Sequence, residues 1–114
     1  MDFRLDNSLV DAGIDTVVVG IAKNVDPQAV LPVAFLEKKQ VMEEWALQCQ
    51  LEEVAESAVV TGYTDLLQKV GRSIKKNPPT ILALIRNIQH RGALPQINSI
   101  IDIYNVESLK SFLA

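Results

Sequence analysis

The fold class of this chain depends on residues 15–22, Asp-Thr-Val-Val-Val-Gly-Ile-Ala, near its start. The run is rich in β-branched residues and lies between Gly13 and Asn24, two residue types that are common in turns. Because its apolar residues follow one another without alternation, the run predicts a strand that is covered on both faces. A lone strand leaves its backbone hydrogen-bonding groups unpaired, so we expect further strands and a small β-sheet.

Two long stretches after this run have helical periodicity. Apolar side chains recur at helical spacing over residues 33–50, with charged side chains elsewhere on the helical wheel. The same spacing continues over residues 52–70, where Gly62 is a candidate break and Gly71 a candidate helix end. One kinked helix or two separate helices account equally well for this second stretch.

The last third of the chain predicts two further helices with clear boundaries. The sequence Lys-Lys-Asn-Pro-Pro at residues 75–79 predicts a loop, because proline cannot occupy a helix interior. From Ile81 the apolar residues fall at i, i+1, i+3, i+4 and i+7, which predicts a helix that ends near Gly92. A final helix runs from Ile97 almost to the chain end. We therefore predict an α+β fold, rich in helix with a small β-sheet, in a single domain over residues 1–114.

The composition excludes several classes of protein. The chain holds one cysteine, Cys49, and one histidine, His90, so we expect neither a disulfide framework nor a zinc site of the Cys/His kind. Its five glycines are too widely spaced for a phosphate-binding loop, and no nucleotide or other cofactor is implied. No apolar run reaches the roughly 20 residues of a membrane span, and the acidic start is unlike a signal peptide. We expect a cytoplasmic protein without a membrane partner.

The net charge of −3 conceals a strong segregation of charge along the sequence. Residues 1–65 carry four basic and twelve acidic side chains, a net charge of −8, whereas residues 66–101 contain no acid at all. Such an asymmetry indicates an anionic partner such as RNA, or else a basic segment that faces acidic groups of the same fold. The candidate RNA-binding residues are the six basic side chains of the acid-free stretch: Lys69, Arg72, Lys75, Lys76, Arg86 and Arg91.

A motif near the end of the chain resembles a known family. Residues 94–105 are Leu-Pro-Gln-Ile-Asn-Ser-Ile-Ile-Asp-Ile-Tyr-Asn. They are similar to a family pattern of proline, isoleucine and asparagine, then two aliphatic residues, an aspartate, an aliphatic residue and a closing asparagine. This pattern resembles the B3/B4 domain of the phenylalanyl-tRNA synthetase beta subunit and its stand-alone relatives. Further features occur in the same order as in those relatives: Tyr63, Gly71, Lys75, Lys76, Pro79, Leu82, Leu84, Ile85 and Arg86.

The resemblance implies an RNA-linked role. In the synthetase this domain is the editing module, which hydrolyses tyrosine wrongly attached to phenylalanine tRNA, because a pocket shaped for phenylalanine admits such an analogue too often. The asparagine that closes the motif belongs to the family's editing site and corresponds to Asn105. The position before it, threonine in many synthetases, is Tyr104 here. The resemblance thus implies that Asn105 and Tyr104 bind substrate, whereas the residue type alone also allows Asn105 to satisfy local backbone groups.

The family's other editing residues follow this motif: a histidine, then strands that contribute a glycine and a glutamate. The chain ends at Ala114 before any of them, so we expect a truncated domain, the N-terminal half of a B3/B4-like fold. The resemblance implies that the chain descends from an aminoacyl-tRNA deacylase. Hydrolysis in that family needs groups from both halves of the domain to be positioned together. We therefore expect no useful hydrolytic activity from the chain alone. An apolar face left by the missing half predicts a homo-oligomer, or a second subunit that supplies that half.

Other polar residues are predicted to be structural. His90 lies at a helix end, where a cation complements the helix dipole, and Cys49 lies on an apolar stripe as a small hydrophobe. Asn98 is expected to cap the final helix. Two functions of different class remain. One is a tRNA-binding module of the editing type, and the other is a non-catalytic protein-interaction or structural remnant that self-associates.

Overall fold

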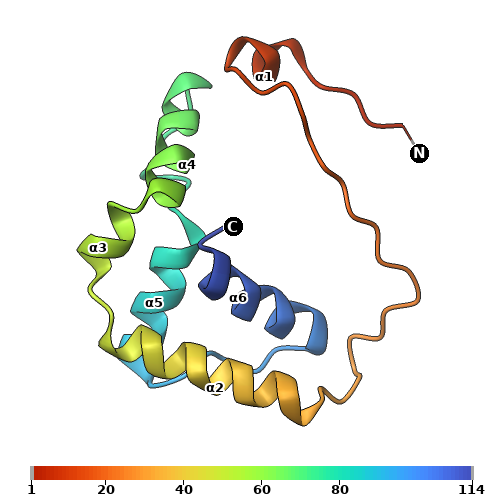
Figure 1. The fold of residues 1–114 in the computed structure, drawn as a ribbon, viewed down its shortest axis with the longest axis vertical. Helices are drawn as coiled ribbons and strands as arrows, with labels where there is room; N and C mark the ends of the chain where they lie inside the picture. The colour runs from red at the N-terminus through yellow and green to blue at the C-terminus, as the bar shows by residue number, and fades with distance from the viewer. Residues whose placement is uncertain (1, 114) are drawn as a thin grey trace.

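Figure 1 shows the computed structural model of the chain, which describes residues 2–113 and forms six helices over that range. A largely extended segment, residues 14–31, joins the first helix to the second and is called the arm below. The helices are α1 (Asn7–Asp11), α2 (Val33–Gln48), α3 (Leu51–Ala55), α4 (Ala58–Lys69), α5 (Thr80–Arg91) and α6 (Ser99–Ser111).

The predicted α+β fold with a small β-sheet is wrong, because residues 2–113 form no strand. The run at 15–22 lies in the arm, and residues 15–25 make no backbone hydrogen bond with any described residue. β-Propensity expresses how well side chains pack on a pleated surface, and the described chain offers no second strand for pairing. The β-branched side chains are therefore exposed, Val18 by 91%.

The core lies where α2, α5 and α6 pack against one another (Figure 1). Helix α5 contributes most to it, since Ile81, Ile85 and Ile88 lie at i, i+4 and i+7 on one face and are completely buried. Leu109 of α6 is equally inaccessible to solvent. The helix predicted after Ile81 is confirmed, and Gly92 ends it in the left-handed region with a φ of +92°.

Two long-range hydrogen-bond anchors hold α2 against the later part of the chain. The Gln89 side-chain amide donates to the carbonyl oxygens of Ala46 and Cys49, each at 3.0 Å, and so satisfies carbonyl groups at the end of α2. The Leu94 backbone N–H donates to a Glu43 carboxylate oxygen at 2.7 Å. Because the bonded groups are far apart in sequence, these contacts fix α2, α5 and the segment after α5 in one arrangement.

The second helical stretch forms two helices rather than one kinked helix. The break falls at Ser57, whose hydroxyl donates to the Val54 carbonyl oxygen at 2.6 Å where α3 ends. Gly62 lies inside α4 and does not break it, since glycine costs a helix interior only about 1 kcal/mol relative to alanine. Gly71 follows α4 with a φ of +73°, which confirms it as part of the helix end.

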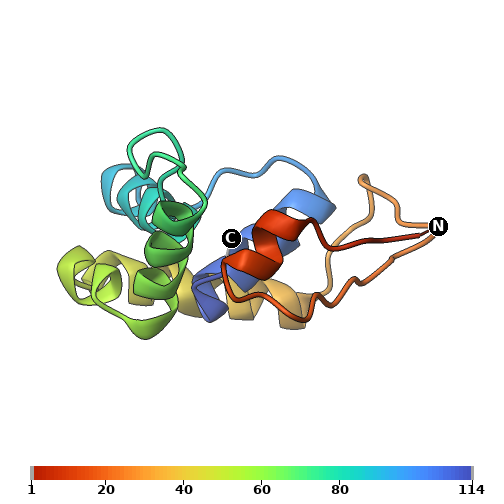
Figure 2. The same cartoon turned by 90° about the horizontal axis from the view of Figure 1, so that it is seen from above.

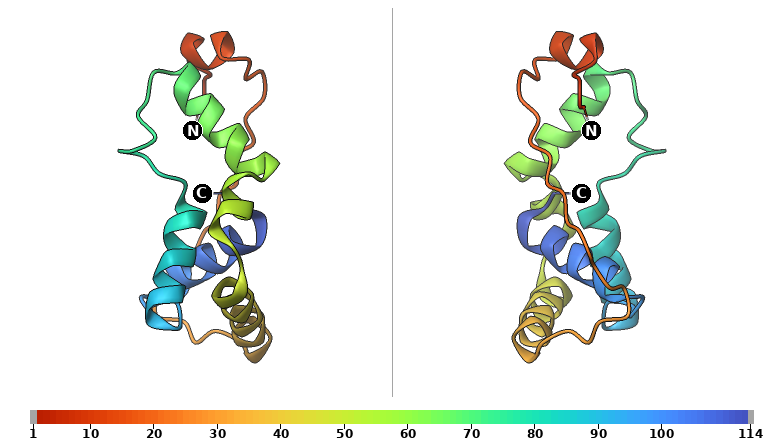
Figure 3. Two further views of the ribbon diagram at one scale, coloured as in Figure 1. Left: turned by 90° about the vertical axis from the view of Figure 1, so that its left-hand side faces the viewer. Right: turned by 90° about the vertical axis from the view of Figure 1, so that its right-hand side faces the viewer.

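The molecule is thin and open. Its principal extents are 43 × 38 × 20 Å, and its radius of gyration, 16.2 Å, exceeds the roughly 13 Å of a compact 100-residue domain. Figure 3 shows the thin profile from both sides, and Figure 2 shows the N-terminal residues and part of the arm projecting beyond the helices. Near its C-terminal end the arm is bound to the start of α6, where the Ser99 hydroxyl donates to the Asp26 carbonyl oxygen at 2.8 Å.

Candidate functional site

The basic segment, residues 69–91, begins where α4 ends. The Arg72 N–H donates to the Leu67 carbonyl oxygen at 2.8 Å across the left-handed Gly71, which is the Schellman arrangement of a helix end. Lys69 lies in the last turn of α4. The first two basic residues are thus placed by a defined backbone geometry.

A closed turn positions the two lysines of the following loop. The Asn77 backbone N–H and its side-chain amide both donate to the Ser73 carbonyl oxygen at 3.0 Å. The Tyr63 hydroxyl of α4 donates to the Asn77 carbonyl oxygen at 3.2 Å and ties the turn to the helix. Lys75 and Lys76 are therefore exposed on an ordered turn just before α5.

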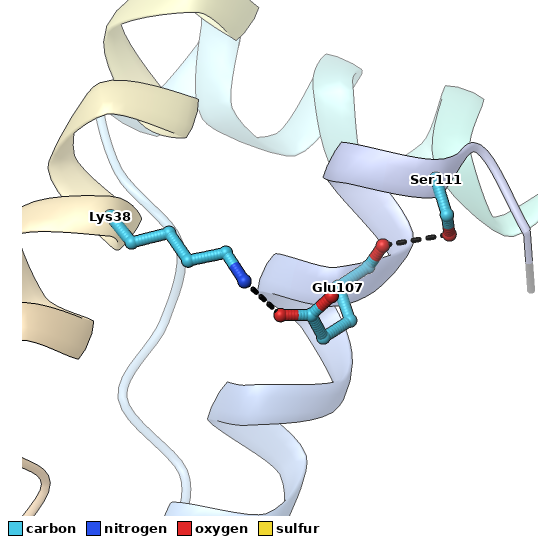
Figure 4. A network of polar contacts seen from close by, with 3 residues as sticks. All are labelled: Lys38, Glu107 and Ser111. Atoms are coloured by element: carbon cyan, nitrogen blue, oxygen red, sulfur yellow. Dashed lines mark hydrogen bonds and ion pairs between the residues drawn. The ribbon is translucent and has the colours of Figure 1, made fainter.

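All six basic side chains of the segment are exposed, and none forms an ion pair with a residue in the range 2–113. The ion pair present there joins Lys38 of α2 to Glu107 of α6, and the Ser111 hydroxyl donates to the Glu107 carbonyl oxygen at 2.8 Å (Figure 4). The hydrogen bond and charge of Lys38, with a smaller effect from Lys110, hold the pKa of Glu107 below its ordinary value. The interpretation in which acids of the same fold neutralise the basic segment has no supporting contact in the described chain.

The structure gathers some of the basic residues and separates others. Arg72, Lys75 and Lys76 share the loop between α4 and α5, whereas Arg91 lies at the far end of α5, about 17 Å along the helix. Arg86 and Arg91 are five positions apart, which places them roughly 140° apart around that helix. They do not share a face. Charges spread in this way match an extended polyanion, whose phosphates are distributed along a backbone, better than a single small anion.

The polar residues of the motif at 94–105 build the start of α6. The Asn98 side-chain oxygen accepts a hydrogen bond from the Ile101 N–H at 2.9 Å, which confirms Asn98 as the N-cap. An Asp102 carboxylate oxygen accepts one from the Ile97 N–H at 3.0 Å. Asn98 thus satisfies a first-turn N–H that the helix itself leaves unpaired, and Asp102 satisfies an N–H of the segment that leads into the helix.

Tyr104 and Asn105 both lie on α6 but point to different sides of it, since consecutive residues are about 100° apart around a helix. Tyr104 is 50% exposed. Asn105 is half-buried, one turn before the buried Leu109. The two predicted substrate-binding residues therefore differ in exposure, and their binding of substrate stays a prediction.

Cys49 packs against the core as a small apolar side chain but is only partly buried, whereas the sequence predicted a buried one. Its thiol donates to the Ala46 carbonyl oxygen at 3.5 Å, and partial burial, with a smaller effect from the Glu53 charge, raises its pKa. It lines an open hollow of about 450 Å³ beside Trp45 and Phe112, whose rings stack with centroids 5.6 Å apart. A raised pKa disfavours the thiolate, so this geometry does not favour a nucleophile.

The other reactive side chains are dispersed. His90 is exposed in the last turn of α5, the helix-end position expected of it. Within residues 2–113, no group of three or more His, Cys, Asp or Glu side chains is placed to hold a metal ion. Among the same residues, no helix has the length and apolar character needed to cross a membrane.

The sequence prediction missed three polar residues that matter for packing. Gln89 and Glu43 form the long-range anchors of α2. Asn87 of α5 has a buried side-chain oxygen without a hydrogen-bond partner in the described chain. An asparagine within an apolar helix is the only signal that the sequence offers for Asn87, because it is a poor helix former.

Comparison of the chain with protein-family models, with curated proteins and with solved structures found no match. Its charge distribution and geometry are therefore the basis for a functional proposal.

Proposed function

We propose that the chain is a tRNA-binding module of the aminoacyl-tRNA editing type, related to the B3/B4 domain of the phenylalanyl-tRNA synthetase beta subunit. The observation that carries the proposal is the basic segment: six exposed Lys and Arg side chains without an ion pair among residues 2–113. Binding of nucleic-acid phosphates by such side chains releases condensed counterions and is favourable at low salt.

The chain is proposed to be inactive as a hydrolase on its own. Hydrolysis of the ester would need a general base and water-positioning groups close to Asn105. Tyr104 and Asn105 point to different sides of α6, and His90 belongs to the end of α5. We expect the purified chain to release no tyrosine from tyrosylated phenylalanine tRNA. Clear turnover that is lost in Asn105→Ala would contradict this part of the proposal.

A fluorescence-anisotropy titration with bulk tRNA at several salt concentrations tests RNA contact. Contacts from three or more basic side chains predict a slope of log K against log salt of about −3 or steeper. Lys75→Gln should weaken binding and make the slope shallower by about one. Lys110→Gln is the matched control, because Lys110 is exposed on α6 outside the basic segment. No binding at low salt, or equal effects of the two substitutions, would contradict RNA contact by this segment.

A second candidate function, self-association, is favoured by a different observation. Ile100, Ile103 and Tyr104 lie at i, i+3 and i+4 on α6 and are 42%, 42% and 50% exposed. Large exposed apolar patches mark interaction surfaces. Sedimentation at tens of micromolar protein should show an oligomer that persists at high salt, because apolar burial does not depend on counterion release. A monomer under these conditions would contradict this function.

A further inference from the structure

The arm contains an extended stretch, residues 15–23, that has no backbone partner among residues 2–113. Alternate side chains of a strand fall on one face, so pairing of this stretch as a strand would place Val17, Val19 and Ile21 on a common face. These three are 56%, 44% and 59% exposed. An unpaired row of backbone N–H and C=O groups flanked by apolar side chains is a template for pairing with another chain.

We propose that residues 15–23 pair with the same residues of a second copy as an antiparallel two-stranded ribbon centred on Val19. In this register Val17 lies opposite Ile21 of the second copy, and Val19 lies opposite its own counterpart. Asp15 then lies opposite Lys23 of the second copy, and the twofold symmetry repeats this pair at the other end of the ribbon. This charge complementarity, at both ends of one short stretch, identifies a second copy as the partner.

Other registers of the same stretch are less favourable. A parallel, in-register pair would place Asp15 opposite Asp15 and Lys23 opposite Lys23, and like charges directly opposite each other are destabilising. An antiparallel register shifted by one residue would set the face with Val17, Val19 and Ile21 in one copy against the opposite face in the other. Of these three arrangements, only the proposed register both places all six of these branched side chains on one side of the ribbon and sets opposite charges opposite each other.

The exposed apolar side chains of α6, Ile100, Ile103 and Tyr104, provide a surface on which this apolar side of the ribbon can pack. A two-stranded ribbon alone is marginally stable in water, so one of its faces must pack on another element. The Ser99 contact holds Asp26 at the start of α6, and the five residues from Ile21 to Asp26 span at most about 17 Å. The ribbon is thereby kept within reach of Ile100 and Ile103. The proposal deepens the second candidate function, self-association, and does not depend on RNA binding.

Sedimentation of charge-exchange variants tests the register. Asp15→Lys and Lys23→Asp each place like charges opposite each other at both ends of the ribbon, and each should raise the dimer Kd about tenfold. The double variant Asp15→Lys/Lys23→Asp restores opposite charges and should return the Kd to within about threefold of the original. Asp11→Lys carries the same charge change outside the ribbon, in α1, and should leave the dimer intact. A monomer at tens of micromolar protein would overturn the ribbon and self-association together.

Disulfide trapping gives an independent readout. In a Cys49→Ser background, Val19→Cys places two thiols directly opposite each other, within the Cα separation that a disulfide accepts. Val18→Cys places its thiol opposite Gly20 instead. We expect rapid oxidation of the first variant to a covalent dimer and little of the second. A dimer that the charge exchanges leave unchanged, or that both cysteines trap equally, would overturn the ribbon while self-association still stood.

Discussion

Ile85 lies at the centre of the helical core, and its truncation tests the packing of α5 between α2 and α6. The side chain is completely buried. Ile85→Ala removes three carbon atoms, worth roughly 0.8 kcal/mol each in transfer free energy, and leaves a cavity that packed helices refill only in part. We expect the free energy of unfolding to fall by about 3–4 kcal/mol.

Urea denaturation followed by the fluorescence of Trp45 measures this loss. Trp45 is the single tryptophan of the chain, and its stacking on Phe112 makes its emission sensitive to unfolding. With a urea m-value near 1.5 kcal/mol/M, the midpoint should fall by about 2 M. Ile97→Ala is the matched control, since Ile97 is 57% exposed and the same truncation there should cost only about 1 kcal/mol. Equal losses in the two variants would refute the placement of the core.

Three further perturbations have defined outcomes. Asn98→Ala should lower the free energy of unfolding by about 1 kcal/mol through loss of the α6 N-cap, and Asn98→Asp should retain most of it; urea midpoints that do not differ would contradict the cap. The pKa of Glu107 is lowered in the folded chain, so its contact with Lys38 stabilises above the unfolded pKa and is lost as pH falls through the folded pKa. Glu107→Gln should therefore be less stable than the original chain at pH 7 and equally stable in acid, and a stability difference that persists in acid would refute the linkage. The pKa of Cys49 is raised in the folded chain, so less of the reactive thiolate is present at neutral pH, and alkylation by iodoacetamide should be slower in the folded chain than in urea. Mass spectrometry measures both rates, and equal rates would show an unperturbed thiol.

Local signals predicted the helical stretches from residue 33 onward, though not the five-residue α1. Helix formation and termination depend mainly on nearby residues, so a single sequence carries such signals. The apolar spacing from Ile81 to Ile88 predicted α5, and the loop before it followed from the paired prolines at 78 and 79. Gly92 was expected near the helix end for the same reason: a left-handed residue there is favourable only for glycine or asparagine. Such features need no information about the rest of the fold.

The sheet prediction failed because a strand is not a local structure. The run at 15–22 has the composition of a buried strand, but its stability depends on a partner that residues 2–113 do not supply. The anchors formed by Gln89 and Glu43 were missed for a related reason. Their hydrogen bonds join residues 40 or more positions apart, and one sequence does not indicate which distant carbonyl or N–H will be near.

The candidate site was predictable only in part. Charge segregation is a property of the sequence, and it identified the basic segment directly. The position of those charges in space also depends on the fold, as the turn that holds Lys75 and Lys76 shows, because a hydrogen bond from Tyr63 ties that turn to α4. The different directions of Tyr104 and Asn105 around α6, by contrast, follow from helical geometry once that helix is predicted.

The two proposals together predict how dimerisation changes RNA binding. Residues 15–23 stand apart from α5 (Figure 1), so we expect the ribbon itself not to cover the basic segments. A dimer that engages RNA through both segments should show about twice the salt slope of a monomer. Val19→Pro combined with Gly20→Pro breaks the ribbon without changing any charge. The N–H groups of adjacent residues point to opposite edges of a strand, so one of the two prolines must remove an N–H that donates to the partner strand. We expect this variant to sediment as a monomer and to bind tRNA with about half the slope; an unchanged slope in the monomer would show that a single basic segment contacts each RNA.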